Sequence, residues 1–188
     1  MEKKAKESTI TEPESKEKII AEYLDGKVIA ESSDVSRDFY EKSRYGDPLQ
    51  KNYQYSFVEA LYLVERGKMQ VMLGKKELIF DQLRKIAIKL EANFFIRYAA
   101  FKDMRNRGYI VKTALKFGAD FRVYDRGVKP GDDHAKWIMY PVAETSMLTW
   151  FEFSAKNRVA HSTRKRLLIA IVDEESSCTF YEIRWTRP

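Results

Sequence analysis

The sequence predicts an α/β (α+β) protein, with a small N-terminal α/β domain followed by a C-terminal α/β domain built on a mixed sheet. Three observations favour this class. Hydrophobic residues make up 44% of the 188 residues, which is enough to offset the ordering entropy of a folded chain. Segments with helical periodicity alternate with short segments typical of strands. The pattern changes near residues 86–93, after which glycine turns separate successive strands, so we place a domain boundary there.

The N-terminal domain is expected over residues 17–90, after a polar tail of residues 1–16 that we expect to be disordered. Its expected elements are a strand at 27–31, a helix at 32–46, a loop at 47–55, a helix at 56–67, a strand at 68–73 and a basic amphipathic helix at 76–91. Ser56 and Glu59 have the spacing of a capping box, and Gly67 follows as a stop signal. This half holds no histidine, no cysteine and no glycine-rich loop after a strand, so we expect it to be structural.

The C-terminal domain is expected over residues 91–188. Its expected elements are a helix at 93–108, strands at 109–118, 119–127 and 136–143, a helix at 144–158, and a hairpin of strands at 166–173 and 178–185. Strand alternation in "FRVY" places Arg122 and Tyr124 on one face. If the chain is already extended there, the same alternation places Arg164 and Arg166 on the face opposite to Lys165, and the basic triplet cannot then bind one phosphate together.

Charge and composition narrow the class of partner. The chain has 34 Lys+Arg against 28 Asp+Glu, a net charge of +6, which favours a polyanion such as nucleic acid. Its single cysteine, Cys178, excludes an intrachain disulfide and a thiolate metal cluster. No apolar run approaches the roughly 18 residues of a membrane helix, and residues 1–18 lack the apolar region of a secretory signal. We therefore expect a cytoplasmic protein without a membrane partner.

Few residues have the chemistry of a catalytic site. His134 lies in a loop next to Pro130 and Gly131, where it is either a proton shuttle or a surface histidine. For His161 a structural or surface role is the favoured interpretation. Tyr124 ends an alternating strand, and its phenol acts as a base only where positive charge lowers its pKa. Otherwise its ring simply covers the edge of the sheet.

Metal and cofactor chemistry find little support. The acidic clusters at residues 132–133 and 173–175 lack the spacing of metal ligands, and no phosphate loop, dinucleotide motif or serine elbow is present. A histidine, a tyrosine, a lysine and several arginines remain. They suffice for metal-free cleavage of RNA, whose own 2′-hydroxyl is the nucleophile. A metal-dependent nuclease that uses Asp120 or Asp133 with Lys136 stays open as an alternative, and no cofactor is expected.

Several motifs together resemble the archaeal tRNA-splicing (tRNA-intron) endonucleases. The resemblance covers roughly residues 25–188. In the C-terminal half it rests on "RNRGYIVKTALKFGADFRVYDRG", "DHAKW", "VAHSTRKRLLIAIVDEE" and "TFYEIRW". In the N-terminal half it rests on "SRYGDPL" and "SFVEALYLVERGKMQV". All three positions of the family's catalytic triad are filled, by Tyr124, His134 and Lys165, so the chain resembles a catalytic subunit. The alternative is a non-catalytic, RNA-binding structural subunit of the same complex.

The resemblance implies a role for each residue of the triad. Tyr124 would take the proton from the 2′-hydroxyl, His134 would protonate the leaving 5′-oxygen, and Lys165 would stabilise the charge on the phosphorane. The implied products carry a 2′,3′-cyclic phosphate and a 5′-hydroxyl, and no metal is needed. The implied substrate is precursor tRNA with a bulge-helix-bulge at each intron junction.

The resemblance also implies RNA-binding and docking residues. Arg158 and Arg184 would hold a flipped bulge base, with Arg187 as an alternative to Arg184. Asp173, Glu174 and Glu175 would form an acidic loop that docks into another dimer, although an acidic tip that keeps a hairpin soluble is the simpler interpretation. A homotetramer is expected, and a heterotetramer with a structural paralogue is the alternative.

Overall fold

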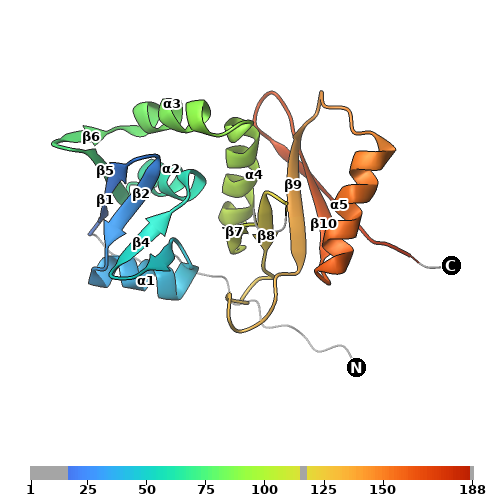
Figure 1. Cartoon of the computed structure of the whole chain (residues 1–188), viewed down its shortest axis with the longest axis horizontal. Coiled ribbons are helices and arrows are strands. Elements are labelled where there is room, and N and C mark those ends of the chain that lie inside the picture. Colours follow the sequence, from blue (N-terminus) through green and yellow to red (C-terminus); the bar gives the residue numbers. More distant parts are fainter. Residues whose placement is uncertain (1–16, 115–117, 187–188) are drawn as a thin grey trace. The chain divides into compact units, whose positions relative to one another are not determined.

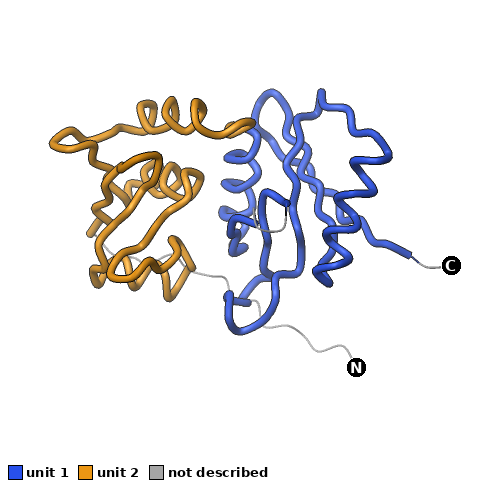
Figure 2. The backbone as a smooth tube through the Cα atoms, in the orientation of Figure 1, with its two compact units in different colours: residues 1–10, 96–188 blue, residues 11–95 orange. Residues whose placement is uncertain are grey.

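The protein is seen in a computed structural model that describes residues 17–114 and 118–186. The expected disordered tail lies outside these residues. The described chain forms two compact units, divided between Phe95 and Ile96 (Figure 2). Each unit combines helices with a β-sheet, so the predicted α/β class is confirmed. The domain limits drawn from the sequence stay predictions.

The N-terminal unit contains a six-stranded sheet with the strand order β3-β4-β2-β1-β5-β6 (Figure 1). Neighbouring strands are antiparallel except for β1 and β5, which are parallel. The strands are β1 (Ile19–Leu24), β2 (Lys27–Glu31), β3 (Asp47–Leu49), β4 (Asn52–Tyr55), β5 (Met69–Leu73) and β6 (Lys76–Leu78), and the helices are α1 (Asp34–Ser43), α2 (Phe57–Glu65) and α3 (Phe80–Leu90).

Local capping signals are confirmed in this unit. The Ser56 hydroxyl accepts a hydrogen bond from the Glu59 backbone N–H, and the Glu59 carboxylate accepts from the Ser56 backbone N–H at 3.0 Å. Glu59 is buried, and its second oxygen accepts from the Gly46 N–H at 3.3 Å. The capping box therefore also joins the start of α2 to the turn after α1.

The prediction for this unit is wrong in three places. Strand β1 was not expected, although Asp25 and Gly26 (φ 45° and 79°) form the kind of turn that joins hairpin strands. The expected loop at 47–55 is the hairpin β3–β4, whose Tyr53 and Tyr55 are buried. The expected helix at 76–91 begins as strand β6, because Leu78 pairs with Val71 of β5. In each case pairing with a neighbouring strand overrides weak local propensity.

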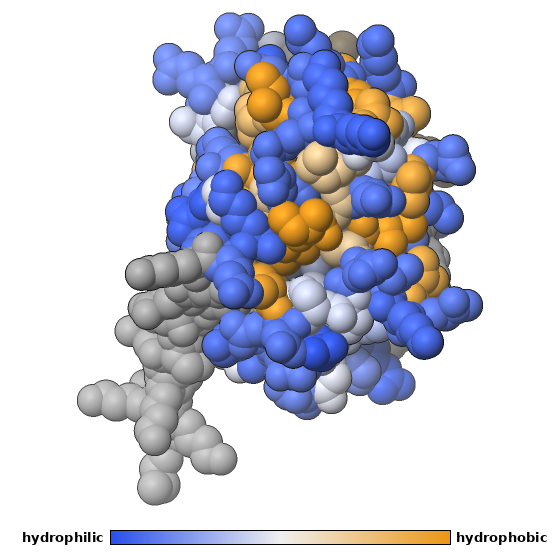
Figure 3. All heavy atoms as spheres, turned by 90° about the vertical axis from the view of Figure 1, so that its left-hand side faces the viewer, coloured by the Kyte–Doolittle hydropathy of each residue, from blue (hydrophilic) through white to orange (hydrophobic). Residues whose placement is uncertain are grey.

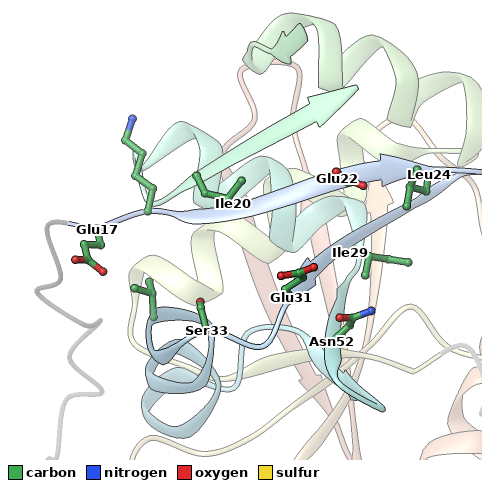
Figure 4. Close-up of a pocket in the computed structure, with 10 residues that line it drawn as sticks. Glu17, Ile20, Glu22, Leu24, Ile29, Glu31, Ser33 and Asn52 are labelled. Atoms are coloured by element: carbon green, nitrogen blue, oxygen red, sulfur yellow. The ribbon is translucent and has the colours of Figure 1, made fainter. Parts of the chain in front are cut away.

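One face of the N-terminal sheet is not covered by any helix of the described chain, and apolar side chains gather on it among charged ones (Figure 3). Ile20 and Leu24 of β1 are 56% and 50% exposed. Together with Ile29 they line a shallow hollow whose polar lining includes Glu22 and Glu31 (Figure 4). The buried residues of these strands alternate with the exposed ones and point to the opposite face.

The C-terminal unit contains a five-stranded mixed sheet with the order β11-β10-β9-β8-β7. Only β9 and β10 are parallel, and α5 connects them. Ile138 and Leu167 pack with Ala160 of α5 on one face, whereas Phe121 packs against Phe101 of α4 on the other, and Figure 1 shows the sheet between these helices. The elements are α4 (Phe94–Asn106), β7 (Val111–Thr113), β8 (Phe121–Val123), β9 (Trp137–Ala143), α5 (Trp150–Ser162), β10 (Arg166–Val172) and β11 (Cys178–Ile183).

The helix expected at 144–158 begins and ends later than predicted. Thr149 is its cap, in a capping box with Glu152, so α5 starts at Trp150. The Glu144 backbone N–H donates to the Val172 carbonyl at 2.9 Å, which extends the sheet beyond β9. The last turn of α5 contains His161. None of the helices in the described chain is long and apolar enough to cross a membrane.

Candidate active site

Backbone hydrogen bonds of Lys136 join three strands at one end of the C-terminal sheet. The Lys136 N–H donates to the Val123 carbonyl at 2.9 Å, and the Lys136 carbonyl accepts from the Arg166 N–H at 3.0 Å. The end of β8 and the starts of β9 and β10 therefore lie together (Figure 1). Tyr124 directly follows Val123, and Lys165 directly precedes Arg166.

Tyr124 is held as a continuation of β8. Its backbone N–H donates to the Ile110 carbonyl at 2.9 Å. The residue is 5% exposed and packs in a small cluster with Ile110, Ala135 and Val128. Packing therefore holds the Tyr124 ring in one position, which a catalytic side chain needs in order to meet its substrate in the right geometry.

His134 lies on the exposed loop that connects β8 to β9. Its backbone N–H donates to Oδ1 of Asp133 at 2.6 Å. The adjacent residue Ala135 is buried in the Tyr124 cluster, so the backbone next to the histidine is anchored beside Tyr124. The imidazole is accessible from solvent, as a proton donor to a bound substrate must be.

Lys165 lies in the tight turn between α5 and β10. Its backbone N–H donates to the Ala160 carbonyl and its Nζ to the Thr163 carbonyl, both at 2.8 Å. Burial, and then the positive charge of Arg122, lower the pKa of the Lys165 ammonium. Two cations that are partly shielded from water create a positive potential, and this potential stabilises an anion bound between them.

The acidic residues of the metal-dependent alternative are engaged in other contacts. Asp120 forms an ion pair with Arg97 at 2.9 Å, and burial raises the pKa of its carboxyl. Lys136 is paired with Asp125 at 2.5 Å, and its ammonium lies 4.4 Å from the centre of the Trp137 ring. Within residues 17–114 and 118–186, no three His, Cys, Asp or Glu side chains are grouped as metal ligands.

Two adjoining depressions lie beside α5 and the C-terminal segment. The larger, about 350 Å³, is lined by Arg158, and the smaller, about 180 Å³, by Lys165 and Arg184. Both share Asn157, His161 and Trp185. The two arginines predicted to bind RNA therefore lie near one another and near the predicted catalytic lysine. Arg187 lies outside the described residues.

The sequence analysis missed the aromatic floor of these depressions. The rings of His161 and Trp185 are 5.0 Å apart, and Trp185 is 59% exposed. His161 stands three residues after Arg158 in a helix, which places both on one face. Trp185 directly follows Arg184. These spacings were the available signals, but the helix was expected to end before His161.

Glu182 lies on the face of the C-terminal sheet opposite to α5, where it binds three neighbouring side chains. Its carboxylate accepts hydrogen bonds from Trp137 Nε1 at 2.7 Å, Arg184 Nε at 2.6 Å and Arg166 Nη1 at 3.2 Å. Burial alone would raise the pKa of the Glu182 carboxyl, but these bonds outweigh it and lower the pKa to about 2. The alternation expected for Arg164, Lys165 and Arg166 does not apply, because Arg164 (φ 55°) lies in the turn before β10. Lys165 and Arg166 both line the smaller depression.

The acidic loop joins β10 to β11. The Asp173 carboxylate accepts from the Ser177 N–H at 2.8 Å and so closes the turn of its own hairpin. The Glu174 N–H donates to Oε1 of Glu144 at 3.2 Å. Glu174 and Glu175 are exposed. Of the three acids, these two are therefore available for a partner.

Comparison with known proteins covers both units. Residues 19–84 match the model of the tRNA intron endonuclease N-terminal domain, and residues 94–180 match that of the catalytic C-terminal domain. The chain is 38% identical over 161 residues to a tRNA-splicing endonuclease of Thermococcus onnurineus, covering 86% of this chain and 92% of the relative. It is 44% identical over 137 residues to that of Nanoarchaeum equitans, covering 70% and 88%. For Methanothermobacter thermautotrophicus the identity is 37% over 164 residues, covering 87% and 95%. The chain thus belongs to the tRNA intron endonuclease family, as its motifs predicted.

Proposed function

We propose that this protein is a tRNA-splicing endonuclease subunit that excises introns from precursor tRNA at bulge-helix-bulge junctions. The family models and the names of the relatives support an endonuclease that acts on tRNA. One structural observation carries the proposal for the site. The backbone bonds of Lys136 hold together the segments that carry Tyr124 and Lys165, with His134 on the adjoining loop.

The proposed reaction is a transesterification that needs no metal. Tyr124 takes the proton from the 2′-hydroxyl, and the 2′-oxygen attacks the adjacent phosphorus. The bond from phosphorus to the 5′-oxygen breaks, and His134 gives its proton to that oxygen. Lys165 stabilises the charge that develops on the non-bridging oxygens. The products are a 2′,3′-cyclic phosphate and a 5′-hydroxyl.

The depressions beside α5 suit an unpaired base. Arg158 and Arg184 supply guanidinium planes for stacking, and His161 and Trp185 form an aromatic surface between them. Proteins that read unpaired RNA commonly stack its bases on aromatic and arginine side chains. We therefore assign base binding to this region and chemistry to the neighbouring end of the sheet.

An intron has two junctions, so two active subunits at a fixed spacing are needed. In this proposal the C-terminal units pair through β11, which is the edge strand of its sheet. An edge strand presents unpaired backbone groups that can pair with another chain. The acidic loop of Asp173, Glu174 and Glu175 docks between the resulting dimers, with Asp173 closing the turn and the two exposed glutamates facing the partner. The assembly is a homotetramer, or a heterotetramer with a structural paralogue.

The test is cleavage of a short bulge-helix-bulge RNA in excess EDTA, followed by analysis of the product ends. Cyclic-phosphate and 5′-hydroxyl ends that disappear with Lys165→Ala would support the enzyme class and the site together. Lys85→Ala, an exposed change on α3, is the matched control and should cleave normally. Binding without cleavage by the wild-type chain would favour the structural-subunit alternative, and cleavage that needs Mg²⁺ would favour the metal-dependent one.

A further inference from the structure

Arg122 places a long charged side chain on the face of the C-terminal sheet that carries the apolar cluster packed against α5. It is the central residue of β8 and pairs with Ile138 of β9, which in turn pairs with Leu167 of β10. Directly paired residues point to the same face of a sheet. Ile138 and Leu167 pack with Ala160 of α5. Arg122 therefore points to the face that α5 covers.

Other cations surround Arg122. Lys112 of β7 lies directly opposite it in the register, and Lys112 is buried. Like charges in directly opposed positions destabilise a sheet. On the other side, the charge of Arg122 reaches Lys165, where it contributes to lowering the pKa of the ammonium. Three positive groups thus lie on one face, at the end of the sheet where the candidate active site lies.

Within the described parts of the chain, the guanidinium of Arg122 forms no ion pair with an acid. Its Nε is buried and has no hydrogen-bond acceptor in the described chain. Other arginines with a buried Nε have a partner: Arg44 and Arg105 lie over aromatic rings, and Arg84 and Arg97 are paired with acids. No such partner of Arg122 occurs among residues 17–114 and 118–186. A half-buried cation without an acceptor is costly unless a ligand supplies the anion.

We propose that Arg122 binds a phosphate of the RNA backbone, as a cation of the active site in addition to Lys165. Tyr124 follows Arg122 by two residues and points to the same face, because side chains alternate along a strand. A phosphate held here would lie beside the tyrosine and the lysine and would offset the mutual repulsion of the cations. The identity of the ligand as RNA rests on the proposed function. The inference that Arg122 binds a phosphate group, here called the oxyanion site, does not rest on it.

The first test measures affinity for a bulge-helix-bulge RNA that carries 2′-deoxy nucleotides at the cleavage positions and is therefore not cut. We expect Arg122→Gln to weaken binding about tenfold near 0.1 M salt, since it removes one charge-assisted contact. The slope of log Kd against log salt should become shallower by about 0.7 to 0.9, the contribution of one phosphate. Arg122→Lys should retain most of the slope. Lys85→Gln, an exposed loss of the same charge, should leave both quantities unchanged.

The second test uses inorganic phosphate as the probe and needs no RNA. Phosphate should raise the Tm of the wild-type protein relative to chloride at equal ionic strength, and Arg122→Gln should abolish most of that increase. In chloride alone Arg122→Gln should be at least as stable as the wild type, because the change removes charge repulsion. A clear loss of stability in chloride would show a structural role and overturn the proposal.

The two tests separate this inference from the proposed function. A wild-type protein that cleaves the RNA, with an unchanged salt slope and an unchanged phosphate effect in Arg122→Gln, would overturn the role of Arg122 alone. If the wild-type protein does not cleave the RNA, but phosphate raises its Tm and no longer does so in Arg122→Gln, the phosphate site at Arg122 is supported and the proposed function is contradicted.

Discussion

The Glu182 carboxylate accepts hydrogen bonds from Trp137, Arg166 and Arg184. Replacing Glu182 by alanine and by glutamine should separate the contribution of the Trp137 bond to stability from that of the two arginine ion pairs. In Glu182→Ala all three hydrogen bonds are lost, and Nε1 of the largely buried Trp137 loses its acceptor. In Glu182→Gln the side-chain carbonyl oxygen still accepts from Trp137, but the ion pairs with Arg166 and Arg184 become neutral contacts.

The expected magnitudes follow from exposure. A hydrogen bond to a charged acceptor contributes about 1.5–3 kcal/mol. The side chains of Arg166 and Arg184 are 43% and 65% exposed, so each ion pair is expected to contribute only about 0.5 kcal/mol after solvent screening. Glu182→Ala should therefore lower the free energy of unfolding by about 3 kcal/mol, and Glu182→Gln by about 1 kcal/mol.

The dependence on pH has a definite sign. The pKa of Glu182 is lowered in the folded state, to about 2, whereas the unfolded chain has an ordinary glutamate pKa. The carboxylate therefore contributes its full stability above roughly pH 4.5 and loses it as the pH falls towards 2. Because Glu182→Gln does not titrate at this position, the difference between wild type and Glu182→Gln should be constant from pH 7 to 5. It should then shrink from pH 4.5 to 3.

The assay is urea unfolding followed by tryptophan fluorescence. All three tryptophans, Trp137, Trp150 and Trp185, lie in the C-terminal unit, so the signal reports that unit alone. Equal losses in Glu182→Ala and Glu182→Gln would refute the assigned role of the Trp137 bond. A difference between wild type and Glu182→Gln that grows below pH 4.5 would refute the lowered pKa.

Three further predictions concern caps, chemistry and assembly. Ser56→Ala removes the cap of α2 and should lower the free energy of unfolding by about 1 kcal/mol, measured by urea unfolding followed by circular dichroism. His134→Ala should slow single-turnover cleavage by about 10²–10⁴-fold and leave the Kd for RNA almost unchanged. Arg158→Ala should chiefly raise the Kd. A large rise in Kd with His134→Ala would contradict the role of His134 as the acid. Reversing the charge of Glu174 and Glu175 to lysine should lower the oligomeric state measured by light scattering, and an unchanged mass would exclude these two residues from docking.

Local signals in the sequence determined much of the secondary structure. The cap of α2 was predictable because Ser56 and Glu59 interact three residues apart, and the final hairpin because strands 166–172 and 178–183 enclose a short polar turn. Strand β1 and the hairpin β3–β4 were not predicted. Their residues are polar or mixed on one face, and only pairing with neighbouring strands makes them strands.

The sequence by itself determined the class of fold, the family and the residues with suitable chemistry, because motifs and short-range spacings are properties of the chain. Only the tertiary structure decided what surrounds those residues. Lys112 and Arg122 lie on consecutive strands, whereas Lys165 is far from both in the sequence, and the sheet register and the turn after α5 bring the three charges together. Likewise, packing against His161 places Trp185 beside α5. The burial of a residue and the electrostatic effect of distant charges on it depend on which strands pair. Strand pairing is determined by the sequence of the whole sheet and not by any single motif.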